Sequence, residues 1–203
     1  MRKCSKCGNL LSPAENFNGS DICDLCLVTT RLQEKKRMAM LKNIEDIPPE
    51  YRGKTEAQAI IDVLNKRGGG KSIWEINIYA TGTRDVMSKM KWSIAEHIWR
   101  NAHSARVVNF LSWTHEYSCL GQDKWEKLSE TISFNGYLII DADTLLCDQS
   151  LLYVIIQGRK DKGRYTCVIT NFSRKEEETR TISHDISGFI GDKVNKYLKA
   201  DLY

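Results

Sequence analysis

Hydrophobic residues follow two alternating patterns along the last three-quarters of the chain. Short apolar runs rich in β-branched and aromatic residues are typical of buried strands, and such runs occur at 73–81, 105–111, 136–141 and 164–170. Apolar positions at helical spacing predict helices at 55–67, 87–102, 113–128 (whole or broken), 144–159 and 184–199. Strands that alternate with helices favour right-handed crossovers and a parallel sheet with helices on both faces. The pattern therefore predicts the α/β fold class.

The first quarter of the chain has a different pattern. Residues 27–41 lack Gly and Pro and are rich in Lys, Arg, Met and Leu, which predicts a helix that ends near Asn43. Residues 44–54 contain two of the three prolines and are the expected linker. We therefore expect a small module with a basic helix at 1–43 and an α/β domain at 55–203, since roughly 150 residues suffice for one core.

Four cysteines predict a zinc site in the first module. Cys4, Cys7, Cys23 and Cys26 form two CxxC pairs separated by fifteen residues, and each such turn can direct two thiolates to one tetrahedral ion. The segment has few apolar residues, so Zn²⁺ would supply its folding energy, and a closed four-thiolate shell leaves no open position for catalysis. A redox CxxC pair or unrelated thiols are the alternatives. The remaining cysteines have apolar neighbours and are expected in the core: Cys119, Cys147 and Cys167.

Composition and charge indicate the general class of protein to which this chain belongs. The chain has 203 residues, 41% hydrophobic and 28% charged, with a net charge of +4, which is typical of a soluble globular protein. It has no apolar run of about 18 residues and no apolar stretch of a secretory signal near its start, so we expect a cytoplasmic protein without a membrane partner. Residues 1–45 carry eight Lys/Arg and five Asp/Glu. Most of this basic excess lies at 31–42, which is suited to contact phosphate or acidic protein, or forms a solvated helix face.

Two segments are candidates for a phosphate-binding loop, which needs glycines, a Lys and a Ser/Thr between a strand and a helix. Residues 67–72 (RGGGKS) contain Gly-Lys-Ser but follow a predicted helix, and a flexible connector is the alternative. Residues 80–90 (ATGTRDVMSKM) follow a predicted strand and place Lys89 at the lysine position. Met90 stands where a Ser/Thr would hold Mg²⁺, and a thioether is a poor ligand for that ion. Weak binding of ATP or ADP, or an ordinary connection with a solvated lysine, are the two interpretations.

Polar residues follow two of the predicted strands, at the sheet edge where α/β proteins bind ligands. Asp141 ends the strand at 136–141, where nucleoside triphosphatases hold an acid for the metal. The alternative is a plain strand end followed by Asp143 as a helix N-cap. Asn171 follows the strand at 164–170 and is suited to contact a γ-phosphate or to shape a turn.

The order of several short motifs resembles that of one family. IPPEYRGK after the CxxC module, then NIYATG, LIIDADTL and LLYVIIQGRKDKGRYTCVITNFS, are similar to the bacterial and phage replicative-helicase loaders and the related transposon helper ATPases, which are AAA+ proteins. The resemblance implies a P-loop/AAA+-like domain in which Lys89 is the P-loop lysine, Asp141 directs Mg²⁺ and Asn171 is the sensor. It also implies a zinc module that binds a replicative DNA helicase, and an AAA+ part that contacts single-stranded DNA and other loader subunits.

The sequence departs from this family at the positions where hydrolysis is carried out. The loop lacks its glycines and its Ser/Thr, Ala142 occupies the catalytic acid position, and 186–190 has no arginine for a neighbouring subunit's nucleotide. We therefore expect a DNA replication accessory protein with weak or lost ATP hydrolysis. An inhibitory or adaptor copy of a loader and an active ATP-dependent loader are the alternatives.

A simple nucleic-acid-binding module is a further alternative. Aromatic side chains can stack on single-stranded bases, but at helical spacing they more often belong to the core. The tryptophans concerned are Trp92, Trp99, Trp113 and Trp125. Other enzyme classes lack support, because no HExxH or GxSxG motif is present.

Overall fold

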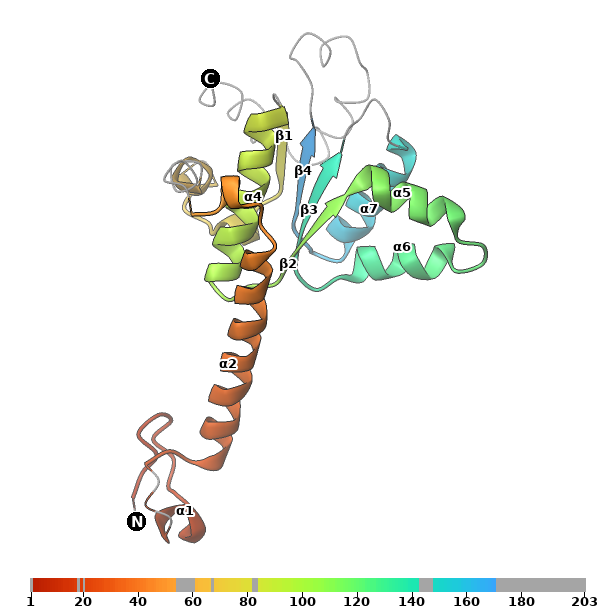
Figure 1. Cartoon of the computed structure of the whole chain (residues 1–203). Helices are drawn as coiled ribbons and strands as arrows, with labels where there is room; N and C mark the ends of the chain where they lie inside the picture. Colours follow the sequence, from red (N-terminus) through yellow and green to blue (C-terminus); the bar gives the residue numbers. More distant parts are fainter. Residues whose placement is uncertain are drawn as a thin grey trace.

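Four parallel strands form the centre of the C-terminal domain (Figure 1). The computed structural model describes residues 2–17, 19, 21–53, 61–66, 68–81, 84–142 and 148–170. The strands are β1 (Ile78–Thr81), β2 (Ala105–Asn109), β3 (Tyr137–Ala142) and β4 (Thr166–Thr170). Their order in space is β1-β4-β3-β2. For the described residues, the predicted α/β class and parallel sheet are confirmed.

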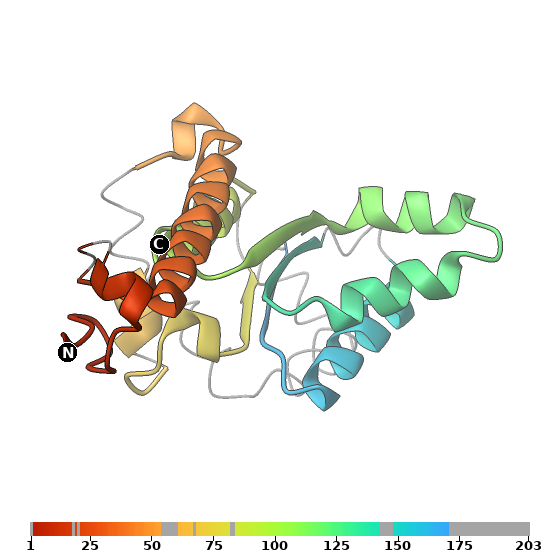
Figure 2. The same ribbon diagram turned by 90° about the horizontal axis from the view of Figure 1, so that it is seen from below.

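Helices cover both faces of the sheet. One face packs against α4 (Arg84–Arg100), and the other packs against α5 (Phe110–Cys119), α6 (Lys124–Ser133) and α7 (Gln149–Asp161). Alternate residues of β1 point to opposite faces of the sheet. Ile78 and Ala80 pack in the hydrophobic core on the α4 side, and Tyr79 packs in the core on the opposite side. All five residues of β4 are buried, as expected for a parallel strand covered on both sides. The view in Figure 2 shows the strands between the two groups of helices.

Local caps explain where two predicted strands differ from the structure. The expected strand at 73–81 begins only at Ile78, because Ser72 and Glu75 form a capping box around the short 3₁₀ helix η2 (Ile73–Glu75). The strand at 105–111 ends at Asn109, whose side chain accepts a hydrogen bond of 3.0 Å from the Ser112 N–H and starts α5. The segment at 113–128 is broken, since α5 and α6 are separate helices.

The N-terminal quarter consists of the short helix α1 (Pro13–Phe17) and the long helix α2 (Asp24–Glu45). The end of α2 and part of the expected linker pack on the α4 side of the core, where Ile44 and Ile47 are buried. The Arg52 guanidinium donates to the carbonyls of Glu45 and Ile47, both at 2.7 Å, across the 3₁₀ helix η1 (Pro49–Tyr51). These contacts fix the C-terminal end of α2 to the α/β domain.

The structure confirms some of the remaining predictions, contradicts one, and does not describe the residues of others. Cys167 is buried as expected, whereas Cys119 is exposed near the end of α5, and Cys147 lies outside the described residues. Residues 61–66 are helical, and the helix expected at 184–199 lies outside the described part of the chain. Among the helices that are described, none combines the length and apolar character needed to cross a bilayer.

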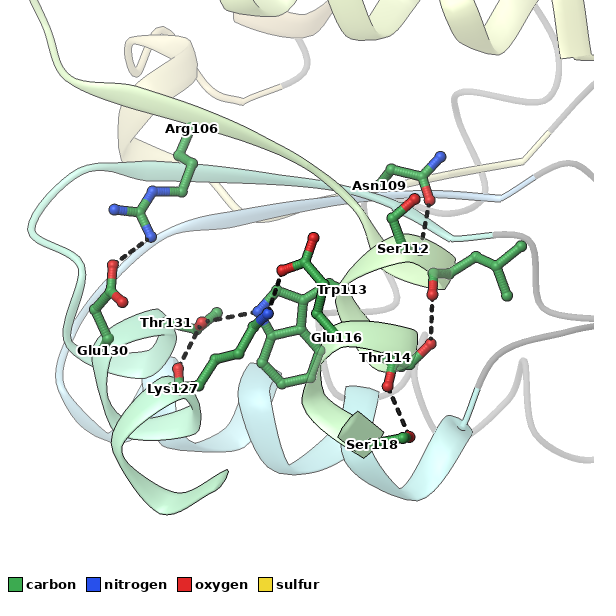
Figure 3. A network of polar contacts seen from close by, with 11 residues as sticks. Arg106, Asn109, Ser112, Trp113, Thr114, Glu116, Ser118, Lys127, Glu130 and Thr131 are labelled. Atoms are coloured by element: carbon green, nitrogen blue, oxygen red, sulfur yellow. Dashed lines mark hydrogen bonds and ion pairs between the residues drawn. The ribbon is translucent and has the colours of Figure 1, made fainter. Parts of the chain in front are cut away.

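The tryptophans are mostly structural. Trp99 and Trp113 are buried, and Trp92 packs partly buried against the core on the α4 side. Trp113 lies between α5 and α6, and its indole Nε1 donates to the Thr131 hydroxyl at 3.2 Å (Figure 3). Trp125 differs, because 75% of its surface is exposed on α6.

Candidate metal centre and candidate nucleotide site

The four predicted zinc ligands lie together in the N-terminal module. The Sγ atoms of Cys4, Cys7, Cys23 and Cys26 all lie within 4.8 Å of one another, and the Cys7 and Cys23 sulfurs are 3.8 Å apart. A tetrahedral zinc site with Zn–S bonds of ~2.3 Å has sulfurs about 3.8 Å apart. The four thiolates therefore fit a structural Zn²⁺ ion and leave no coordination position for a substrate.

Backbone hydrogen bonds shape the first CxxC turn around the site. The Cys4 N–H donates to the Asn9 carbonyl at 2.7 Å, and the Gly8 N–H donates to the Cys4 carbonyl at 2.9 Å. Gly8 has φ +75°, a left-handed conformation that glycine adopts without strain. The chain therefore reverses direction directly after Cys7, and Asn9 lies beside Cys4.

A buried glutamate joins the two halves of the module. One Glu15 carboxylate oxygen accepts from the Asp24 N–H and the other from the Ser12 N–H, both at 2.5 Å. The Asp24 N–H, followed by the contacts with Ser12, lowers the pKa of Glu15. Because Glu15 belongs to α1 and Asp24 is the first residue of α2, this carboxylate ties α1 to the start of the long helix.

The thiols differ in acidity because their surroundings differ. Backbone N–H groups, first that of Cys23 at 3.4 Å, lower the pKa of Cys4 to about 6. The neighbouring sulfurs of Cys23 and Cys7 raise the pKa of Cys26 to about 12. Without a cation, four thiolates this close would repel one another, so some of the four cysteines keep their protons. Metal binding would then release those protons from the cluster.

Apolar side chains project into solvent on the helix that follows the four cysteines. Leu25, Val28 and Leu32 are 74%, 52% and 55% exposed, and their spacing of three and four residues places them on one face of α2. In Figure 1 this part of α2 and the cysteine module extend away from the sheet. The predicted basic segment follows on the same helix, with Lys35 one turn beyond Leu32. We call Leu25, Val28 and Leu32 the zinc-side stripe. Exposed basic residues of α2 follow directly after this stripe.

The carboxyl edge of the sheet holds the candidate nucleotide residues. Since α4 begins at Arg84, only residues 82 and 83 separate it from β1, and both lie outside the described residues. Lys89 lies in the second turn of α4, where its Nζ is 3.0 Å from an Asp85 carboxylate oxygen. The expected loop at 80–90 is therefore mostly helix. A phosphate loop needs more residues between strand and helix.

Asp141 has a partner that sequence reasoning missed. Its carboxylate forms an ion pair with Lys91 of α4, and both side chains are largely buried. Lys91 is two residues beyond Lys89 and therefore points to a different side of the helix. Ala142 is fully buried, and Asn171 lies outside the described residues.

The second candidate loop connects a helix with a 3₁₀ turn. Residues 68–72 follow the helical residues 61–66 and precede η2, and Gly69 and Gly70 have φ of +70° and +79°. The Ser72 side chain is used in the capping box of η2. This geometry is that of a tight connector between two elements.

No protein-family model matches the chain, and no curated protein is significantly similar to it.

Proposed function

We propose that this chain is a DNA replication accessory protein of the helicase-loader type, which docks on a replicative helicase through its zinc module and α2 without hydrolysing ATP. The observation that carries the proposal is the placement of a closed four-cysteine site beside an exposed apolar stripe, at the end of α2 remote from the sheet. A metal site without an open position serves structure rather than catalysis. An exposed row of large apolar side chains next to it is typical of a protein-binding surface.

The basic residues after the stripe favour an acidic helical partner. Arg31, Lys35 and Lys36 are exposed on α2. The three residues of the zinc-side stripe have the i, i+3 and i+7 spacing with which one helix face contacts a partner. A second copy of α2 would bring like charges together, which disfavours self-pairing. Phosphate would leave the apolar row without contacts. These features support a helicase segment with apolar and acidic residues as the partner.

The contacts at the carboxyl edge of the sheet support a role without ATP hydrolysis. Asp141 is paired with Lys91, and Lys89 with Asp85, so the acid and the lysine expected for Mg-ATP each contact a protein charge. Ala142 has no group to activate water. The α/β domain then serves as a scaffold that presents α2 and the cysteine module to the partner.

The test is binding of the full-length, zinc-loaded protein to the replicative helicase of its source organism. Leu32→Glu places a charge in the apolar row, and we expect it to weaken binding at least tenfold, because a large apolar contact contributes about 1.5–3 kcal/mol. Gln33→Glu is the matched control, since it adds the same charge at the next exposed position, on another side of α2. We expect the control to change affinity less than threefold.

The same variants show whether the protein stimulates or inhibits helicase loading. If the protein stimulates helicase loading and Leu32→Glu abolishes the stimulation, it is an active accessory factor. If it blocks loading in a Leu32-dependent way, it is an inhibitory copy. No binding to the helicase, or equal binding by both variants, would refute docking through the stripe.

A further inference from the structure

A buried arginine of α7 points to the amino ends of the strands, and none of the described residues gives it a carboxylate partner. Arg159 is completely buried, and its guanidinium donates five hydrogen bonds. All of the acceptors are neutral oxygens of described residues: the Thr166 hydroxyl and the carbonyls of Thr131, Phe134, Gly136 and Tyr165, at 2.7–3.3 Å. Its hydrogen bonds are thus satisfied, while its charge has no counter-ion among them.

A second arginine adds to this positive charge. Arg164 follows α7, and its backbone N–H donates to the Arg159 carbonyl at 2.9 Å. Its Nη1 donates to the Asn135 side chain, and its Nε is buried without a hydrogen-bond partner. Burial, and next the charge of Arg164, lower the pKa of Arg159 to about 10, which still leaves it charged at neutral pH. The third arginine nearby, Arg106, does have a carboxylate partner, because it pairs with Glu130 at 2.9 Å (Figure 3).

A small cavity lies at this place on the surface. Its volume is about 200 Å³, and it is lined by residues that precede the strands, among them Trp74, His103, Asn135, Arg164 and Tyr165. Its lining contains a guanidinium and an imidazole but no carboxylate. The ring of Trp74 stacks on His103 with centroids 4.1 Å apart, which gives the cavity one rigid wall.

We propose that this cavity binds the phosphate group of a small anion or of a nucleic-acid strand, with Arg164 as the contacting cation and Arg159 as the charge beneath it. A planar guanidinium matches the oxygens of a phosphate. The cavity is smaller than the roughly 300–1,000 Å³ of sites that enclose drug-sized ligands, so it accommodates the phosphate group rather than a whole nucleotide. Because the Arg164 Nε is shielded as it now lies, we expect the guanidinium to turn when the anion binds.

This site is independent of the proposed helicase docking. The cavity lies at the amino ends of the strands, opposite the edge that holds Asp141, and it contains no residue of the zinc module. Failure of one proposal therefore leaves the other standing.

The experiment is a titration of the full-length, zinc-loaded protein with sodium phosphate at constant ionic strength, followed by NMR signals of the Trp74 indole and the His103 ring. We expect saturable shifts of both signals. Arg164→Gln should weaken binding about tenfold or more, as expected for loss of a charge-assisted hydrogen bond. Arg2→Gln, an exposed arginine in the N-terminal module outside the basic segment 31–42, removes the same charge elsewhere and should change affinity less than twofold.

A second variant protects the test against loss of folding. Asn135→Asp puts a carboxylate beside Arg164 and supplies the missing counter-ion within the protein. We expect this variant to lose phosphate binding at least tenfold while its thermal midpoint rises. A merely structural role of the arginines predicts the higher midpoint but no phosphate-dependent shifts in any variant, and that result would overturn the proposal.

Oligonucleotides distinguish the sources of the phosphate. A short single strand with a 5′-phosphate is compared with the same strand carrying a 5′-hydroxyl. Stronger shifts with the 5′-phosphate would identify a strand end as the ligand, equal shifts would identify the phosphodiester backbone, and shifts with inorganic phosphate alone would identify a free anion. Absence of shifts with all three probes would refute the site.

Discussion

Arg159 shows how far a single side chain can depart from what its sequence context predicts. An arginine in the last turn of a helix is expected to lie in solvent and to interact with the helix dipole. Here the carbonyls of Phe134, Gly136 and Tyr165 converge on one point before β3 and β4, and the guanidinium satisfies all three. Only the fold brings those carbonyls together, so the sequence held no signal for this contact.

We expect Arg159→Met to destabilise the protein by about 3–5 kcal/mol, because several buried carbonyls would lose their donors at once. Urea unfolding followed by circular dichroism measures this loss. The control Arg37→Met, on the exposed part of α2, should stay within about 0.5 kcal/mol of the wild type. Similar stability of the two variants would mean that water replaces the guanidinium without cost.

Helix phase explains why the acid at 141 was recognised but its partner was not. The strand pattern located Asp141 at the end of β3. The choice between Lys89 and Lys91 depends on which side of α4 faces the sheet, and a motif aligned by spacing alone does not contain that information. Lys89 pairs along its own helix with Asp85, and Lys91 crosses to the strand.

At the scale of elements, hydrophobic runs located the strands and capping residues decided their ends. β3 and β4 lie within the predicted runs or differ by one residue. β1 and β2 are shorter than predicted, because Ser72 with Glu75 and then Asn109 start helical turns inside the apolar runs. Apolar residues suit a strand or a buried helix turn equally well, so periodicity did not separate the two.

The zinc module offers a test of what holds the N-terminal elements together. The module has little apolar core, and metal binding contributes about 10–16 kcal/mol in comparable zinc modules. We therefore expect a chelator to unfold the module and the adjoining turns of α2, with a loss of helical circular dichroism. Tryptophan fluorescence should not change, because all five tryptophans lie between Trp74 and Trp125.

Two serine variants make the assignment specific. Cys7→Ser should lose bound zinc and reproduce the effect of the chelator. Cys119→Ser replaces an exposed cysteine of α5 and should keep a full equivalent of zinc. Equal zinc content in the two variants would contradict the four-cysteine site.

At the scale of the whole molecule, the alternation of strands and helices predicted a parallel sheet but not its order. The pattern does not say which strands are neighbours. In the structure β4 lies between β1 and β3, so the ends of strands distant in the sequence meet at one edge. That order brings α4, which follows β1, within reach of Asp141 on β3.

The paired charges at that edge predict how the molecule responds to nucleotide. We expect MgATP at about 1 mM, the upper end of usual KM values, to leave the thermal midpoint unchanged, and phosphate release to stay at background. Lys89→Ala should behave like the wild type. A midpoint that rises with MgATP in the wild type but not in Lys89→Ala would instead identify a working nucleotide site.

The continuous helix α2 also sets the mechanical scale of the protein. It has 22 residues, about 33 Å at 1.5 Å per residue, and its C-terminal end is anchored through Ile44 and Arg52. Such a rod acts as a lever, because a tilt of about 10° at the anchor displaces the far end by about 6 Å. A small rearrangement of the anchored end against α4 would therefore move the cysteine module by several times that amount.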